Sequence, residues 1–287
     1  MRFAAYRQSG VRGLAAADGN GPFRAVAVTD DRYPGNLADL VAGGTECLLA
    51  AGRALQTGRE LELGSVELLP PLPAPAKIIC IGLNYADHSA ESGFKVPDYP
   101  TVFGRFASSL IGHAAPIVRP RVSEQLDFEG EFVAVIGRGG REIPKARALD
   151  HVIAYSLFND ASIRDYQLRT PQWTVGKNFD DTGAFGPYLV TADELPPGCQ
   201  GLRLQTRLNG EVMQSASTND LVFDVATLVS LLSEVFTFEA GDIIVTGTPA
   251  GIGLARKPPL WMKPGDVCEV ELEGLGVLRN PIVGRSA

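Results

Sequence analysis

The pattern of apolar and polar positions along the chain is mostly that of short strands. Runs rich in apolar residues, bounded by glycine or polar turns, are typical of strands buried in a core. On this basis we predict buried strands over 77–83, 131–140, 151–160 and 242–253, the last of which passes into a glycine loop. The Asn209-Gly210 pair predicts a two-residue hairpin turn within 205–214, and residues 266–282 predict a closing hairpin.

Helical spacing, in which apolar residues recur at intervals of three and four, is found in fewer segments. It is strongest over 223–236, and 161–169 also has helical character. A short helix is predicted within 84–93, where Asn84 is a candidate N-cap and Gly93 a stop. The main part of the chain is therefore an α+β, strand-rich domain with few helices, and it lacks the regular β–α alternation of a Rossmann sheet.

About the first 70 residues predict a separate small unit of strands and helix. Strands are predicted over 2–7 and 23–28, on either side of the turn-rich segment 17–22. Residues 36–55 have the apolar spacing of a helix.

A proline-rich segment follows this unit. Four prolines between Pro70 and Pro75 exclude a regular helix or a central strand from residues 68–77. We expect this segment to link a small N-terminal domain, 1–70, to a main domain, 71–287.

Composition narrows the classes of function. The 287 residues are 45% hydrophobic and 21% charged, as in an ordinary globular protein with a sizeable core. A net charge of −7 argues against a broad nucleic-acid surface, which needs clustered lysine and arginine. No apolar run approaches the about 20 residues that span a membrane, and the N-terminus lacks the apolar core of a signal peptide. We therefore expect a cytoplasmic protein that binds neither nucleic acid nor membrane.

Cysteine and histidine are too sparse to predict a zinc or other soft-metal site. The four cysteines are scattered without a CxxC pair and predict buried thiols, and the chain has three histidines. A metal bound here would take most of its ligands from carboxylates, which favours Mg²⁺, Mn²⁺ or Ca²⁺.

The segment LDFEGEF, residues 126–132, carries carboxylates at alternate positions. In a strand, Asp127, Glu129 and Glu131 point to one face, and like charges at that spacing repel one another. A solvated face of an antiparallel sheet explains such a pattern, and so does a bound divalent cation. This segment alone leaves both interpretations open.

Two further segments carry candidate catalytic groups. His88 and Glu91 share a face of the predicted helix, where the carboxylate either orients the imidazole as a general base or forms an ordinary surface pair. Asp160 ends a predicted strand and is either a helix cap or a third metal ligand. In the second case Arg164 and Gln167, one helical turn apart, face the same pocket.

Two glycine-bracketed loops complete the candidate groups. Lys177 lies in the predicted loop 174–187, where a lysine is either solvated or placed to stabilise an oxyanion. Residues 246–253, TGTPAGIG, lack the ending of a P-loop and the spacing of a dinucleotide fingerprint, which argues against nucleotide binding. Such a loop can still offer backbone N–H groups to a carboxylate.

Together these motifs resemble the fumarylacetoacetate hydrolase family. Five motifs occur in one order between about residues 75 and 285, namely IGLNYADHxxE, LDFEGEFVAVIGRGG, FNDASIRDYQ, GKNFDDTGAFGPYLVT and TGTPAGIG. The resemblance implies the family's mixed β-sandwich roll with a few flanking helices, preceded by a small N-terminal α/β appendage. It points to the bacterial acylpyruvase or 2-hydroxyhepta-2,4-diene-1,7-dioate isomerase type of member.

The resemblance also implies roles for individual residues. The family's Mg²⁺ or Mn²⁺ ligands match Glu129, Glu131 and Asp160, its catalytic groups match His88, Glu91 and Lys177, and its substrate contacts match Arg164, Gln167 and Thr248. Asp127 also fits the family pattern, and we place it outside the ligand set. Arg105, at a position where relatives often have lysine, is left without a role.

Members of this family act on short 2-oxo or 2,4-dioxo acids, so the resemblance implies an enzyme with a small oxo-acid substrate. The first hypothesis is hydrolysis of a C–C bond in an acylpyruvate such as fumarylpyruvate, through an enolate held by the metal. A second is an oxaloacetate-type decarboxylase or a 2-hydroxydienoate isomerase of aromatic catabolism that uses the same site. A third is a non-catalytic, metal-stabilised binding module. We also expect a homodimer, because the family is usually dimeric and exposed sheet edges need covering.

Overall fold

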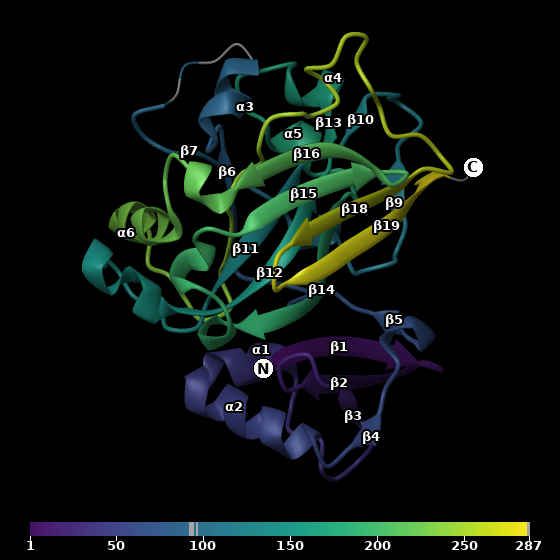
Figure 1. Cartoon of the computed structure of the whole chain (residues 1–287), viewed down its shortest axis with the longest axis vertical. Helices are drawn as coiled ribbons and strands as arrows, with labels where there is room; N and C mark the ends of the chain where they lie inside the picture. Colours follow the sequence, from purple (N-terminus) through teal and green to yellow (C-terminus); the bar gives the residue numbers. More distant parts are fainter. Residues whose placement is uncertain (92–94, 96, 286–287) are drawn as a thin grey trace.

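A sheet of twelve strands runs through the molecule, which we describe from a computed structural model covering residues 1–91, 95 and 97–285 (Figure 1). The main path of the sheet is β4-β3-β2-β1-β14-β12-β11-β17-β6-β7, while β5 pairs with β1 and β8 with β14. Its strands are β1 (Arg2–Gln8), β2 (Val11–Ala17), β3 (Arg24–Ala27), β4 (Arg59–Glu60), β5 (Glu67–Leu68), β6 (Ile78–Gly82), β7 (Thr101–Gly104), β8 (Leu110–Ile111), β11 (Gly130–Ile136), β12 (Val152–Asp160), β14 (Gly183–Thr191) and β17 (Ile243–Val245).

A second sheet of five strands covers one face of the first sheet at β11, β12 and β14 (Figure 1). Its order is β16 (Glu211–Ser217), β15 (Arg203–Leu208), β18 (Val267–Leu272), β19 (Gly276–Gly284) and β9 (Ile117–Arg119). Apolar side chains of both sheets, such as Phe132, Leu204 and Val270, are buried in one core. A small separate ladder joins β10 (Leu126–Asp127) to β13 (Ser162–Ile163). The predicted strand-rich α+β fold is confirmed.

The described residues contain few helices, and these are short. The α-helices are α1 (Leu37–Ala42), α2 (Gly44–Leu55), α3 (Ala86–Glu91), α4 (Arg164–Gln167), α5 (Thr174–Lys177) and α6 (Val225–Val235). Single 3₁₀ segments lie at Leu63–Ser65, Ala107–Ser109, Lys145–His151, Ala192–Glu194, Pro197–Cys199 and Thr218–Asp220. The predicted amphipathic helix is α6, which begins after Asp224 and buries Leu228 and Leu232. None of the helices described is long and apolar enough to cross a membrane.

The N-terminal unit differs from the sequence prediction, which lacked strands β2, β4 and β5 and had one helix in place of two. An extra strand, β2, pairs along its whole length with β1, after a turn in which Ser9 and Gly10 have φ of 49° and 81°. The single helix predicted over 36–55 is two helices, because Gly44 adopts a φ of 80° that interrupts the helical backbone.

The strands of this unit continue the twelve-stranded sheet through β1. Strand β1 pairs with β14 where Arg2 and Phe3 face Val190 and Leu189. Phe3 shares an apolar cluster with Phe185 of β14. Between the end of β5 and the start of β6 there is no helix or strand, as the prolines predict. The division into domains at residue 70 stays a prediction.

The sheet brings four chain segments to one end. Strand β12 is antiparallel to β11, so the end of β12 lies beside the start of β11. Strand β17 is antiparallel to β11 and parallel to β6, so both β17 and β6 end at that same side. The loops that follow β6, β12 and β17 therefore meet there, above the start of β11 (Figure 1).

Candidate active site

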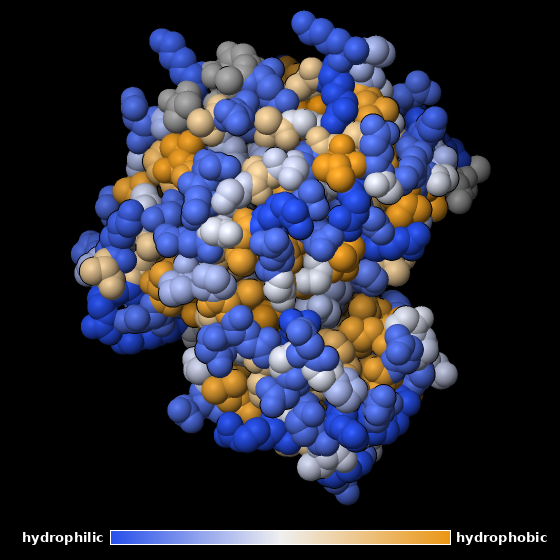
Figure 2. All heavy atoms as spheres, viewed as in Figure 1, coloured by the Kyte–Doolittle hydropathy of each residue, from blue (hydrophilic) through white to orange (hydrophobic). Residues whose placement is uncertain are grey.

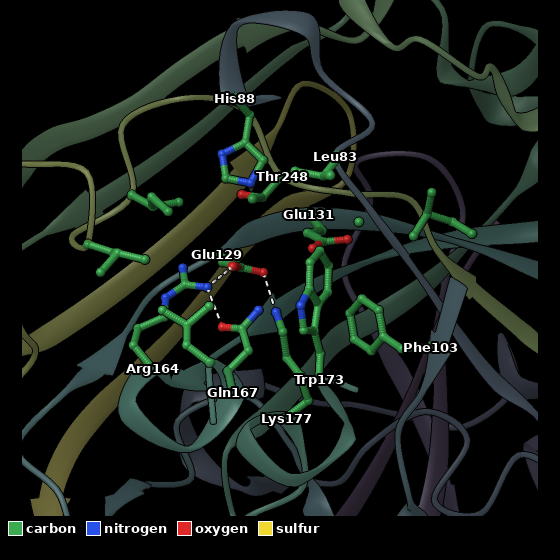
Figure 3. A pocket seen from close by; sticks show the side chains of 15 residues that line it. Leu83, His88, Phe103, Glu129, Glu131, Arg164, Gln167, Trp173, Lys177 and Thr248 are labelled. Carbon is green, nitrogen blue, oxygen red and sulfur yellow. Dashed lines mark hydrogen bonds and ion pairs between the residues drawn. The ribbon is translucent and has the colours of Figure 1, made fainter. Parts of the chain in front are cut away.

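Three carboxylates converge at this end of the main sheet. Glu129 and Glu131 flank the start of β11, and Asp160 is the last residue of β12. All three side chains are buried, and one oxygen of each lies within 4.8 Å of the others. Figure 3 shows Glu129 and Glu131 lining a common pocket with His88, Arg164 and Lys177.

The acidic segment is not the single strand that its alternating pattern predicted. Asp127 belongs to β10, which pairs with β13, and the long strand β11 starts only at Gly130. The Asp127 carboxylate accepts hydrogen bonds from the N–H groups of Gly253 (2.7 Å) and Leu254 (2.9 Å) and from Arg164 Nε (2.8 Å). These partners hold Asp127 outside the carboxylate cluster, where it anchors the loop that follows β17.

Three buried cations neutralise most of the negative charge. The Lys177 ammonium lies 2.6 Å from both Glu129 Oε2 and Asp160 Oδ2. Arg105 Nη1 lies 2.8 Å from Asp160 Oδ1, and Arg164 Nη1 lies 2.6 Å from Glu129 Oε1. Buried charges are tolerated when they are paired in this way, so these cations make the acidic cluster compatible with a folded core.

Glu131 is the carboxylate that these cations leave out. It has no ion-pair partner among the residues that the structure describes, and its Oε2 accepts a hydrogen bond from the N–H of Gly247. Burial, reinforced by the charges of Asp160 and Glu129, raises the pKa of Glu131 well above its ordinary value. Burial also acts to raise the pKa of Glu129, but the Lys177 ammonium and its neighbours outweigh it and lower that pKa to about 2.

A divalent cation fits this donor set. The cluster offers three hard carboxylate oxygens and contains no histidine or cysteine. A cation would supply the positive charge that Glu131 lacks, and it would bind the ionised form of the carboxylate. Glu129, Glu131 and Asp160, the predicted ligands, are thus brought together by the fold.

His88 and Glu91 face this cluster from helix α3. His88 Nδ1 lies 3.0 Å from Glu91 Oε1, and the histidine is 7% exposed. In Figure 3 the imidazole points into the pocket opposite Glu129. Because the carboxylate accepts at Nδ1, the neutral ring carries its proton there and presents an unprotonated Nε2.

The predicted cap of this helix is wrong. Helix α3 begins at Ala86, so Asn84 lies too early to be its N-cap. The buried Asn84 amide instead donates to the carbonyls of Phe223 (3.0 Å) and Thr246 (2.7 Å) and accepts from Phe223 N–H. It fixes the start of the α3 segment to the loop after β17. Gly93, the predicted stop, lies outside the described residues.

Two predicted substrate contacts, Arg164 and Gln167, lie side by side on the short helix α4. Arg164 Nη1 donates to Gln167 Oε1 at 2.8 Å. Arg164 Nη2 is buried with no hydrogen-bond partner in the described part of the chain, so this donor remains for a ligand.

Thr248, the third predicted substrate contact, lines the same pocket. Its hydroxyl donates to the carbonyl of Gly130 (3.0 Å) and accepts from Gln214 Nε2 (2.8 Å). These bonds use the hydroxyl proton to hold the loop against β11, so a ligand could bond Thr248 only as a second donor to its oxygen.

The structure corrects the predicted position of Lys177 and shows a role for Arg105, which the sequence left without one. Lys177 ends helix α5, not a loop, and is 1% exposed, with its ammonium 5.0 Å from the centre of the Phe103 ring. Arg105 is buried beneath the site, where it bonds Asp160 and donates to Thr182 Oγ1 at 2.7 Å. Arg105 therefore holds Asp160 and does not line the pocket.

The pocket above the carboxylates is a cavity of about 170 Å³ lined by both charged and apolar residues. The apolar lining was not predicted and consists of Ile81, Leu83, Phe103, Leu168, Trp173, Ile252 and Leu254. The rings of Phe103 and Trp173 contact edge to face at 5.6 Å between centres. Aromatic residues next to loops are common in any sequence, so nothing in the pattern distinguished these from core residues.

Comparison with known proteins agrees with this arrangement. A family model described as "Fumarylacetoacetate (FAA) hydrolase C-terminal" matches residues 77–283. The mitochondrial oxaloacetate tautomerase fahd2 of Xenopus laevis is 39% identical over 257 residues, covering 88% of this chain and 80% of that protein.

Two solved structures are similar over essentially the full chain. A fumarylacetoacetate hydrolase from psychrophilic Exiguobacterium antarcticum has a TM-score of 0.86 and 36% identity, covering 99% of this chain and 100% of that one. A 5-carboxymethyl-2-hydroxymuconate delta-isomerase from Mycobacterium smegmatis has a TM-score of 0.78 and 32% identity, with 100% of both chains covered. The sequence motifs, the carboxylate cluster and these similarities lead to one conclusion: the chain belongs to the fumarylacetoacetate hydrolase family.

Proposed function

We propose that this protein is a divalent-metal-dependent enzyme that interconverts the keto and enol forms of short 2-oxo diacids, with oxaloacetate as the favoured substrate. The observation that carries the proposal is the buried cluster of Glu129, Glu131 and Asp160, which faces the His88–Glu91 pair across one pocket. Mg²⁺ or Mn²⁺ is the proposed cofactor, because the cluster offers only hard carboxylate oxygens, and Ca²⁺ is a further candidate.

Two kinds of support favour tautomerisation over the hydrolysis that the motifs first suggested. The Xenopus laevis relative, similar over most of both chains, is an oxaloacetate tautomerase, and the Mycobacterium smegmatis neighbour is an isomerase. The pocket also presents one uncommitted cationic donor, Arg164 Nη2. A diacid offers a second carboxylate to that donor, in addition to the 2-oxo acid end that would face the carboxylate cluster.

Tautomerisation moves one proton between C3 and the C2 oxygen. A bound divalent cation would supply a Lewis acid that polarises the C2 carbonyl and acidifies the C3 protons. His88 Nε2 removes a proton from C3 to leave an enolate, whose oxygen takes a proton from water to give the enol. In the reverse direction the enol oxygen releases its proton to water and His88 returns one to C3 to give the ketone. Glu91 holds the ring and stabilises its protonated form, while the Lys177 ammonium places positive charge beside the oxygen as it loses its proton.

Hydrolysis of an acylpyruvate is the second candidate. The same His88–Glu91 pair could take a proton from water, and Lys177 could stabilise the oxyanion that forms. The specific observation in its favour is the apolar lining of the pocket, where Phe103 and Trp173 suit an acyl substituent better than a carboxylate. A non-catalytic binding module is the weakest candidate, because it requires neither the histidine nor the lysine.

The test is to follow each reaction by its own product. Purified protein with Mg²⁺ or Mn²⁺ is mixed with enol-oxaloacetate, and the loss of enol absorbance and the formation of pyruvate are recorded separately against a metal-only blank. We expect enol loss to be accelerated much more than pyruvate formation. Pyruvate appearing as fast as enol is lost would favour decarboxylation, and activity confined to fumarylpyruvate or related acylpyruvates would favour the hydrolase.

A further inference from the structure

The His88–Glu91 pair is continued by a third group from the loop that follows β17. The Gly251 N–H donates to both Glu91 oxygens, at 3.0 Å and 2.9 Å. Glu91 therefore has two fixed points, the imidazole on one side and a backbone amide on the other. The orientation of His88 depends on where that amide is held.

The backbone at Gly251 lies too close to strand β16 for any other residue. Its φ is 106°, and an added Cβ would lie 2.2 Å from the carbonyl oxygen of Met213. Glycine has no side chain whose packing could fix the conformation of its backbone. Some other group must hold this peptide in place.

Arg256 supplies that group. Its Nη2 donates to the carbonyls of Met213 (2.9 Å) and Gly251 (3.2 Å), and its Nε donates to Gly251 at 3.3 Å. The guanidinium thus bridges strand β16 and the loop. It forms no ion pair with any carboxylate in the described ranges, so its donors are used on these two carbonyls rather than on an acidic partner.

We infer that Arg256 is a positioning residue for the general base, acting through Gly251 and Glu91 on His88. The inference rests on the proposed function only in taking His88 as the base. Without the clamp, the Gly251 carbonyl is released and the backbone on both sides of the Gly251 Cα can turn. Glu91 then loses its backbone donor, and the imidazole loses the fixed direction in which Nε2 meets the substrate. Substrate and metal contacts made by other residues remain in place.

A double-mutant cycle tests this chain of contacts. When two residues act through one another, replacing both lowers kcat by less than the product of the two separate effects. We expect Arg256→Met in the metal-loaded enzyme to lower kcat about 10- to 100-fold, the range found for partners that orient the ligands of a metal site, with KM changed less than about twofold. In a Glu91→Ala background, Arg256→Met should lower kcat by less than about a further twofold. Arg256→Lys, which keeps a donor for the carbonyls, should recover part of the loss.

Arg207→Met is the matched control, since Arg207 pairs with Glu269 and Glu271 on the second sheet and, among the described residues, forms no ion pair with the loop after β17. It should leave kcat unchanged. Equal fold-losses from Arg256→Met in the wild-type and Glu91→Ala backgrounds, or an unchanged kcat, would overturn the inference. If Arg256→Met does not fold, Arg256→Gln takes its place in the cycle.

A second readout does not depend on activity. Hydrogen exchange of the Gly251 amide should accelerate in Arg256→Met and in Glu91→Ala, and should not change in Arg207→Met. Unchanged exchange in Arg256→Met would exclude the clamp. A wild-type protein without tautomerase activity would refute the proposed function, while this exchange measurement would still decide whether Arg256 holds Gly251.

Discussion

Replacing Glu131 by glutamine should stabilise the metal-free protein and at the same time remove its metal site. Glu131 is 2% exposed and lies among carboxylates, with no cation of its own in the part of the chain described. Glutamine has the same shape and can still accept the hydrogen bond from the Gly247 N–H. The substitution therefore removes one buried negative charge and little else.

The size of the effect follows from the separations. One oxygen of each carboxylate lies within 4.8 Å of the others, so with an effective dielectric constant of about 20 each repulsion of ionised Glu131 by Asp160 or Glu129 costs at least about 3 kcal/mol. The nearby Lys177 ammonium offsets much of this, so we expect a net gain of about 1–3 kcal/mol in the free energy of unfolding. In a chain of this size that gain raises the melting temperature by about 2–6 °C.

The sign of the pH dependence follows from the raised pKa of Glu131. The folded wild-type protein holds this proton more tightly than the unfolded chain does, so the stabilising contribution is complete below the ordinary pKa of glutamic acid. It is lost as the pH rises through the raised pKa of the folded state. The Glu131→Gln variant lacks this loss, so its advantage over wild type should grow with pH and then level off.

Calorimetric melting between pH 5 and 9 in the presence of a chelator checks this prediction. Added Mn²⁺ should raise the melting temperature of wild type and not that of Glu131→Gln. Asp165→Asn is the control, because Asp165 lies on α4 near the site but its carboxylate accepts a hydrogen bond from Ser123 Oγ at 2.6 Å. A Glu131→Gln variant that melts below wild type in chelator at high pH would refute the reasoning.

Three other predictions concern the base, the pocket and the assembly. In steady-state kinetics, His88→Ala should lower kcat about 10²- to 10⁴-fold with little change in KM, and Glu91→Gln should lower kcat less. An unchanged kcat in His88→Ala would remove His88 from the mechanism. Gly82→Ala places a Cβ 2.3 Å from the Trp173 ring, so it should displace the indole and change KM more than kcat; an unchanged KM would mean that the indole does not meet the substrate. Light scattering at micromolar concentration should give the mass of a homodimer, and a monomer would contradict that prediction.

Much of the fold follows from local pattern. The buried strands β11 and β12 and helix α6 each have an apolar run or spacing that their own residues specify. The Asn209-Gly210 turn follows from two residues that tolerate positive φ, and both have it, at 53° and 83°. Strand β2 could not be predicted in this way, because its alanines and glycine have low strand propensity and its pairing with β1 sets its structure.

The candidate site was predictable as a set of residues but not as a geometry. The alternating acids suggested one strand face, whereas the chain leaves the strand at Phe128 because β10 pairs elsewhere, with β13. Lys177 and Arg105 carry long charged side chains that are usually exposed, and only the distant acids that they meet explain their burial. Such contacts between remote segments leave no periodic signal in the sequence.

The most direct test of the central claim is a titration of metal-free protein with Mn²⁺. The quantity measured is the rate of enol-oxaloacetate ketonisation, from which the rate with metal alone is subtracted. We expect no activity after exhaustive chelation, a linear rise to a plateau at one Mn²⁺ per chain, and restoration by Mg²⁺ but less by Zn²⁺, because the ligands are all carboxylates. Glu131→Gln should give no rise in the same titration. Full activity in the metal-free wild-type protein would contradict the account.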